Sequence, residues 1–369
     1  MSTRHSVLRP TVWVLYAVVV LEFLFMISPF ALHFYSAYGG PLNLLTGSPA
    51  TAWMTWFFLP HFSITTSSAV NALKPIGFLL TGLGLILFLV GAFQVYGAKL
   101  FRRGMVRGGL YRIVRHPQYL SLAVLGLGVS LIWPRYLVLV SFVTMMFLYY
   151  ALARWEERDC RERFGSDYRE YQSRTGMILP RLGRFSRREG AEPVGWRRGT
   201  LTYAVTLGIV LLAAGLGRSF SLTHVTGFFE DETAVLSPAV VSEDVLVQAY
   251  RLALESSEGA AIAAAESRLL VYVVPLGWFV PDLPLHTEEE IRATGGGHGT
   301  TSTTGHLYRV LLARPRLHNQ EAQGRDIVLR AHGLEPLGVA RVDLAARRLV
   351  GWDETPDHVI WGDIPTPLL

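Results

Sequence analysis

The chain has 369 residues, of which 50% are hydrophobic and 17% charged; this balance excludes an ordinary soluble protein of that length and favours a bilayer environment. A net charge of +5 could suggest nucleic acid as a partner. However, residues 1–217 carry 22 basic and 9 acidic side chains, a net charge of +13, whereas residues 218–369 carry 12 and 20, a net charge of −8. This segregation indicates two compartments or two domains, so no nucleic-acid partner is expected. The single cysteine, Cys160, excludes a disulfide framework and a Cys-rich metal site.

Five apolar runs are long enough to predict membrane-spanning helices, because roughly 17–25 apolar residues cross the hydrocarbon core of a bilayer. The runs cover residues 11–32, 75–96, 119–133, 136–153 and 200–216. The first run is longer than the apolar part of a cleaved signal peptide, which favours a retained helix. Only Pro134 and Arg135 separate the third run from the fourth, so these two helices are expected to form a tight hairpin.

The distribution of Lys and Arg predicts the orientation, because cytoplasmic loops near helix ends are enriched in these residues. Residues 97–118 contain six basic and no acidic side chains, residues 154–199 contain twelve more basic side chains, and residues 23–72 contain no charged side chain. The amino terminus and the two basic segments are therefore expected in the cytoplasm. Five crossings would then place residues 218–369 outside the cytoplasmic (inner) membrane.

Residues 218–369 predict a small soluble domain of the α+β class. Ser242, followed by two acidic residues, is typical of a helix start. Short β-like runs follow at 269–274, 307–312, 327–330, 339–344 and 359–361. The fold class expected for the whole chain is thus an all-α multi-pass membrane domain, residues 1–217, followed by an extracytoplasmic α+β domain that folds independently and whose role the sequence does not reveal.

Polar side chains gather at the cytoplasmic rim of the predicted hairpin. Residues 109–119 lead into its first helix, and Glu156 and Glu157 follow its second helix. Because the turn is short, these two ends are expected to be neighbours. Pro117 suits the first turn of a helix and disfavours helical geometry at His116, which would hold the imidazole at the membrane surface.

The stretch from about residue 109 to 180 resembles the isoprenylcysteine carboxyl methyltransferase and phospholipid methyltransferase family. That family combines Arg-His-Pro-x-Tyr-x-Gly, a membrane hairpin, a Glu-Glu pair, Phe-Gly-x-x-Tyr-x-x-Tyr and a proline. The matching residues are Arg115, His116, Pro117, Tyr119, Glu156, Glu157, Phe164, Gly165, Tyr168, Tyr171 and Pro180. Ser121 stands where the family has glycine, and serine still permits close packing. The resemblance covers about a fifth of the chain.

The resemblance implies methyl transfer from S-adenosylmethionine to an acceptor that is lipid-like or a small thiol, carboxylate or amine, at the cytoplasmic face. The cofactor offers a carboxylate, which Arg, His and Tyr donors suit, and an ammonium and ribose hydroxyls, which carboxylates suit. The cofactor-binding residues expected at the rim are Tyr111, Arg115, His116, Tyr119, Glu156 and Glu157. Gly126 and Gly128 would let the cofactor approach a helix backbone. No metal is required, and no catalytic residue is assigned.

Each feature also has a structural interpretation. The arginines could bind anionic lipid, and the glutamates could be solvated charges paired with neighbouring arginines. A second hypothesis is therefore a non-catalytic membrane scaffold that displays the acidic domain for sensing or interaction. Glu22 lies within the first apolar run, where an ionisable group is either functional or paired with a polar group of another helix. No metal site is expected from the scattered histidines His33, His61, His286, His298 and His306.

Overall fold

The computed structural model describes residues 13–14, 16–18, 20–21, 24, 32–101, 104–181, 195–280, 282–286, 299–300 and 305–356, with the backbone alone at 32–38, 99 and 299–300. The chain divides into two compact units. The first unit consists of residues 1–27, 73–133 and 138–212, and the second unit consists of residues 28–72, 134–137 and 213–369. The predicted boundary at 217/218 lies inside a helix, and independent folding of residues 218–369 stays a prediction.

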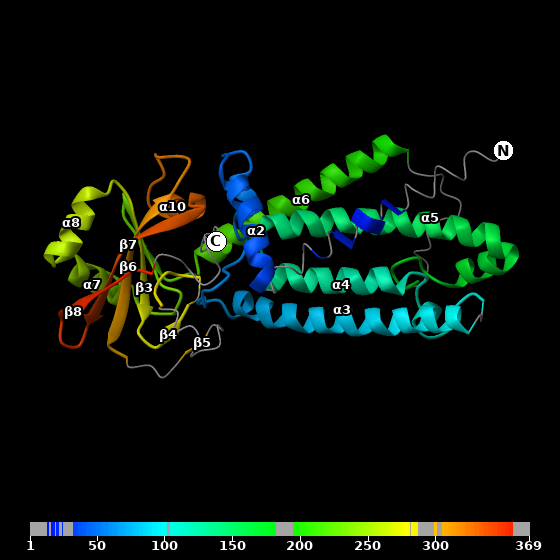
Figure 1. Cartoon of the computed structure of the whole chain (residues 1–369), viewed down its shortest axis with the longest axis horizontal. Helices are drawn as coiled ribbons and strands as arrows, with labels where there is room; N and C mark the ends of the chain where they lie inside the picture. Colours follow the sequence, from blue (N-terminus) through cyan, green and yellow to red (C-terminus); the bar gives the residue numbers. More distant parts are fainter. Residues whose placement is uncertain are drawn as a thin grey trace. The chain divides into compact units, whose positions relative to one another are not determined.

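The first unit is helical. It contains all or most of α3 (Ser68–Leu100), the 3-10 helix η3 (Gly109–Arg112), α4 (Pro117–Ile132), α5 (Tyr136–Arg174) and α6 (Trp196–Leu222). Figure 1 shows α3, α4 and α5 side by side. The prediction of helices at the second to fifth apolar runs is therefore confirmed, as is the short turn between α4 and α5. Most of the first run, with Glu22, lies outside the described residues.

Glycines set the close packing of α3 against α4. A Cβ at Gly128 would lie 2.5 Å from the backbone nitrogen of Thr81 and 2.6 Å from the carbonyl oxygen of Gly77. A Cβ at Gly84 would lie 2.5 Å from the nitrogen of Leu125. Since real side chains do not approach so closely, larger residues would push the two helices apart. Gly128 thus serves helix packing, which corrects the expectation that it lies against a cofactor.

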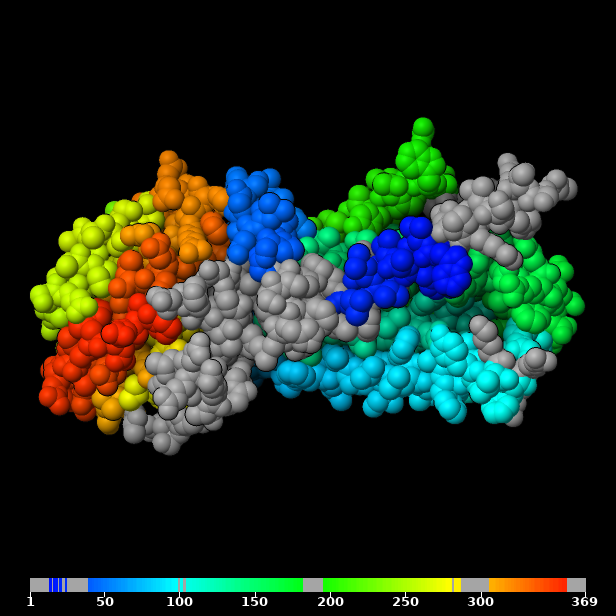
Figure 2. Space-filling view, in the orientation of Figure 1, coloured from blue at the N-terminus to red at the C-terminus, as the bar shows by residue number. Residues whose placement is uncertain are grey.

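Three of the described helices are long and apolar enough to cross a membrane: Ser68–Ala98, Tyr136–Arg174 and Trp196–Leu222. Helix α4 is shorter but also apolar. These helices support a multi-pass membrane protein, whereas the number of five crossings stays a prediction. Figure 2 shows α3 in cyan along one face of the helical unit. Large apolar side chains of α3 are exposed, as expected for a lipid-facing helix: Ile76, Phe78, Leu79, Leu83, Leu85, Ile86, Leu89, Val90 and Phe93.

Helix α5 continues well beyond the apolar run that predicted it. Its 39 residues extend past the apolar part into a charged section that carries the Glu pair. Gly165 interrupts the regular geometry with a φ of 53° and a ψ of −120°, a conformation that residues with a Cβ rarely adopt. The glycine of the Phe-Gly pair therefore marks the bend after which the helix carries Tyr168 and Tyr171.

The second unit contains a six-stranded sheet in the order β1-β2-β3-β6-β7-β8, in which β2 and β3 are parallel and the other pairs antiparallel. Its strands are β1 (Gly227–Phe229), β2 (Thr233–Leu236), β3 (Leu269–Pro275), β6 (Leu307–Arg316), β7 (Gly333–Asp343) and β8 (Arg348–Asp353). A separate pair joins β4 (Trp278–Phe279) to β5 (Gly299–Thr300). Its helical elements are α2 (Leu32–Thr46), the 3-10 helix η2 (Ala52–Thr55), α7 (Glu243–Leu254), α8 (Ser257–Ala265) and α10 (Arg325–Arg330).

Both faces of this sheet are buried. Odd-numbered residues of β3, such as Val271, pack with Leu246 and Ala249 of α7, which Figure 1 shows beside the strands. Even-numbered residues, such as Tyr272, pack in a second core that also contains Phe62. A strand buried on both faces reads as a continuous apolar run, which is why β3 was predictable. Phe62 shows that the segment before α3 contributes to the core of this unit.

One predicted strand is wrong. Residues 327–330 belong to helix α10, which begins after Gly324. The short apolar run at 327–329 suits a buried strand or a buried helix equally. Asp326 and Arg330, four residues apart, form an ion pair at 3.2 Å, which supports the helix. The structure confirms the strands predicted at 269–274, 307–312 and 339–344 and the helix start at Ser242. The strand predicted at 359–361 lies outside the described residues.

Candidate active site

The two ends of the α4–α5 hairpin meet, as predicted. The Tyr119 hydroxyl at the start of α4 donates to Glu156 Oε1 on α5 at 2.8 Å. The segment before α4 also pairs with the chain after α5, since the Arg115 nitrogen donates to the Gly176 carbonyl at 2.8 Å and the His116 nitrogen to the Met177 carbonyl at 3.0 Å. These bonds fix the backbone of both rim segments.

Arg115 forms a buried ion pair with Glu157. Its Nε lies 2.6 Å from Glu157 Oε1, and the two side chains are 8% and 4% exposed. Its Nη1 donates to the carbonyl oxygens of Gln172, at 2.9 Å, and Thr175. The Gln172 amide donates to the other Glu157 oxygen at 3.0 Å. A buried charge is costly unless it is paired and hydrogen-bonded, and here both charges are. Arg115 and Glu157 therefore hold the segment before α4 against the end of α5.

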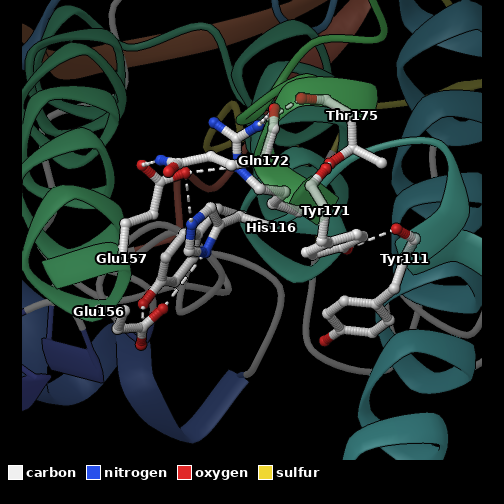
Figure 3. Close-up of polar contacts among 9 residues, drawn as sticks. Tyr111, His116, Glu156, Glu157, Tyr171, Gln172 and Thr175 are labelled. Carbon is white, nitrogen blue, oxygen red and sulfur yellow. Dashed lines mark hydrogen bonds and ion pairs between the residues drawn. The ribbon is translucent and has the colours of Figure 1, made fainter. Parts of the chain in front are cut away.

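His116 lies between the two carboxylates of the Glu pair (Figure 3). Its Nδ1 is 3.3 Å from Glu156 Oε2 and its Nε2 is 3.6 Å from Glu157 Oε1. Burial lowers the pKa of the imidazole, but the nearby carboxylates of Glu156 and Glu157 outweigh this effect, and the pKa is raised above its ordinary value of 6.5. The ring also stacks on Tyr119, with centroids 5.6 Å apart. The His116 imidazole thus lies close to two carboxylates, and both favour its protonated form.

Glu156 is the more accessible member of the Glu pair, with 30% of its side chain exposed. Its Oε1 accepts hydrogen bonds from both Tyr119 and Tyr16, while its Oε2 faces His116. Tyr16 comes from the first predicted span, 140 residues away in sequence, and was not expected at the site. These three contacts fix the orientation of the carboxylate.

A pocket of about 490 Å³ opens beside these groups, within the range typical of small-molecule sites. Of the predicted residues, Tyr111, Arg115, His116, Tyr119 and Glu156 line it, together with residues that the site prediction omitted: Val95, Ala98, Gly104, Met105, Val106, Gln118, Asp159, Cys160, Phe164, Tyr168 and Tyr171. Glu157 is absent from this lining and contacts Arg115 and Gln172 instead. Five of the six residues predicted to bind the cofactor thus line one pocket, and their binding of the cofactor stays a prediction.

Tyrosines close the side of the pocket near η3. The Tyr171 hydroxyl donates to the Tyr111 carbonyl at 2.5 Å, which ties α5 to η3 (Figure 3). Burial, with the Glu156 charge, raises the pKa of the Tyr111 phenol, so this hydroxyl stays protonated as a donor. Gly109, with a φ of 59°, begins η3 beside the Gln94 side chain. The Phe-Gly-x-x-Tyr-x-x-Tyr segment thus belongs to the pocket.

Neither His61 nor His286 lines this pocket. His61 is buried and stacks on Phe57, and His286 is buried and accepts from the Val280 nitrogen at 3.2 Å. Within the part of the chain that the structure describes, no three metal-ligating side chains form a group that could hold an ion. His298 lies outside that part.

Residues 74–167, which contain most of the pocket, match the phospholipid methyltransferase family. This part of the chain is therefore similar to a family of methyltransferases. Two curated relatives are methanethiol S-methyltransferases: that of Pseudomonas deceptionensis is 34% identical over 116 residues, and methanethiol S-methyltransferase 1 of Bradyrhizobium diazoefficiens is 35% identical over 71 residues. These matches cover 28% and 19% of the chain. The chain spans 44% and 24% of the lengths of these relatives, and no solved structure matches it.

Proposed function

We propose that this chain is an integral membrane methyltransferase that transfers a methyl group from S-adenosylmethionine to a small thiol. The observation that carries the proposal is the pocket beside Arg115, His116 and Glu156, because it lies in the domain that matches the family and has the size of a small-molecule site. The relatives' activity supports a thiol as the acceptor.

The pocket residues fit the chemistry of the proposed cofactor. Glu156 presents a fixed carboxylate, which suits the ammonium and the sulfonium of S-adenosylmethionine. Tyr111 and Tyr119 offer phenol groups for the polar ends of the ligand, and Met105, Val106 and other apolar residues surround its less polar parts. The bound cofactor would supply an electrophilic methyl group. The protein's contribution is then mainly alignment and exclusion of water.

Arg115 and Glu157 have different proposed roles. Arg115 lines the pocket, and we propose that its remaining donors meet the carboxylate of the cofactor. Glu157 is buried away from the pocket and holds the Arg115 guanidinium and the Gln172 amide. Glu157 is thus a positioning residue, whereas Tyr111, Arg115, His116, Tyr119 and Glu156 are the proposed contacts to the cofactor.

An acceptor panel tests the activity. Purified full-length protein in detergent is incubated with S-adenosylmethionine and with methanethiol, a phosphatidylethanolamine or a prenylcysteine, and the methylated products are quantified. We expect the thioether from methanethiol as the main product. A methylated lipid in its place would refute the thiol as acceptor but would still support methyltransferase activity. Absence of both product and cofactor binding would refute methyltransferase activity and favour the non-catalytic scaffold that displays the acidic domain.

We also propose that the pocket faces the cytoplasm, because basic residues flank it on the segments 97–118 and 154–199. Residues 218–369 then lie on the opposite side of the membrane. Reporter fusions after Gly176 and after Leu236 test this orientation, since the first is expected to report the cytoplasm and the second the exterior. Two cytoplasmic reports would show that α6 does not cross the membrane.

A further inference from the structure

Among the residues that the structure describes, the charged groups nearest His116 form ion pairs in the free protein. Arg115 and Glu157 neutralise each other at 2.6 Å, and His116 and Glu156 form a second pair at 3.3 Å. Asp159, which also lines the pocket, pairs with Arg163 at 2.9 Å. The other titratable groups facing the site are Tyr16, Tyr111, Tyr119, Cys160, Tyr168 and Tyr171. With His116 protonated, these three ion pairs of described residues carry no net charge.

A cationic ligand disturbs this balance. S-adenosylmethionine carries a carboxylate, an ammonium and a sulfonium, and so brings a net charge of one positive unit. If its cationic part lies against Glu156, the imidazolium loses the neutralising effect of that carboxylate. Glu157 offers only weaker compensation on the Nε2 side, because it lies 2.6 Å from Arg115 and 3.6 Å from His116. Like charges that share one anion in a partly buried site repel, and the group that can lose a proton does so.

We propose that His116 releases one proton when S-adenosylmethionine binds and that the His116–Glu156 pair then accepts the proton of the acceptor thiol. This inference rests on the proposed function. It assigns His116 a role in proton transfer that extends beyond holding the cofactor. Glu156 and His116 both line the pocket and lie 3.3 Å apart; the carboxylate is the contact point, and the imidazole stores the proton.

The proton balance closes over one turnover. The S–H bond of the thiol breaks and its proton passes to the pair. The thiol sulfur forms the new bond to the methyl carbon, and the electron pair of the broken methyl–sulfonium bond stays on the cofactor's sulfur. The product S-adenosylhomocysteine has no sulfonium charge, so the site is again neutral with His116 protonated. The one proton released per turnover leaves at cofactor binding.

Calorimetry of the full-length protein in detergent tests the coupling without any turnover. Binding enthalpies are measured at pH 6.0 in buffers with different ionisation enthalpies, for S-adenosylmethionine and, as a matched control, for S-adenosylhomocysteine. Because the pKa of the His116 imidazole is raised above its ordinary value of 6.5, this imidazole is mainly protonated in the free protein at pH 6.0. We expect release of about one proton with the cationic ligand and about none with the product, and a roughly tenfold loss of S-adenosylmethionine affinity per pH unit below that pKa.

The outcomes separate the two proposals. Binding of S-adenosylmethionine without proton release, or equal release with both ligands, would overturn the role of His116 and leave the proposed function intact. Lack of binding by either ligand would overturn both. His116→Gln is expected to bind S-adenosylmethionine without proton release; a proton released by that variant would come from another group and would overturn the assignment to His116.

Discussion

Replacement of Glu156 by glutamine is the sharpest perturbation of the proposed cofactor site. The substitution keeps the size of the side chain and removes its charge. In the structure this carboxylate accepts from Tyr119 at 2.8 Å and from Tyr16, faces His116 at 3.3 Å, and still has exposed surface in the pocket. Loss of one charge-assisted hydrogen bond to the cofactor costs about 1.5–3 kcal/mol, so S-adenosylmethionine should bind about 10- to 150-fold more weakly.

The matched control is Glu162→Gln, which removes the same charge from an exposed position of the same helix outside the pocket lining. Both variants are titrated with S-adenosylmethionine by calorimetry, and their helicity is compared by circular dichroism. We expect the control to bind like the parent. Equal affinities for the Glu156→Gln variant and the parent, with helicity unchanged, would refute the placement of the cofactor against this carboxylate.

Three further substitutions test the structure by thermal unfolding in detergent. Arg115→Met leaves the buried Glu157 unpaired and should destabilise the protein by about 3–5 kcal/mol, with much of the loss recovered when Glu157→Gln is added; no recovery would contradict the ion pair. Gly165→Ala forces a Cβ into a φ of 53° and should cost about 1–3 kcal/mol, whereas Gly208→Ala, with open space around it, should be nearly neutral. Phe62→Ala, in the core of the second unit, should cost about 3–5 kcal/mol while S-adenosylmethionine affinity is retained; parallel loss of affinity would argue against separate units.

The hairpin and one wall of the pocket were predictable because local sequence determines them. Two apolar runs joined by two residues must return to the same side, and this brings Tyr119 to Glu156 whatever the rest of the fold does. The opposite wall was not predictable in the same way. Val95 and Ala98 lie at the end of a long apolar helix, where nothing in the pattern separates residues that face a pocket from residues that face lipid.

Contacts between distant segments escaped prediction for a related reason. Tyr16 reaches Glu156 across 140 residues, and Phe62 packs into a sheet that begins 165 residues later, at Gly227. An aromatic residue in an apolar run carries no sign of its partner. Residues 327–330 show the limit for short elements, because a run of three apolar residues fits a strand or a single helical turn equally well.

Ultraviolet cross-linking of S-adenosylmethionine that carries a labelled methyl group tests the central claim most directly, because it locates the cofactor on the full-length chain. After proteolysis and mass spectrometry, the account predicts label in the peptides that contain residues 105–119 or 156–171, which line the pocket, and competition by unlabelled S-adenosylhomocysteine. Specific label confined to residues 218–369, or no label that the competitor removes, would contradict it.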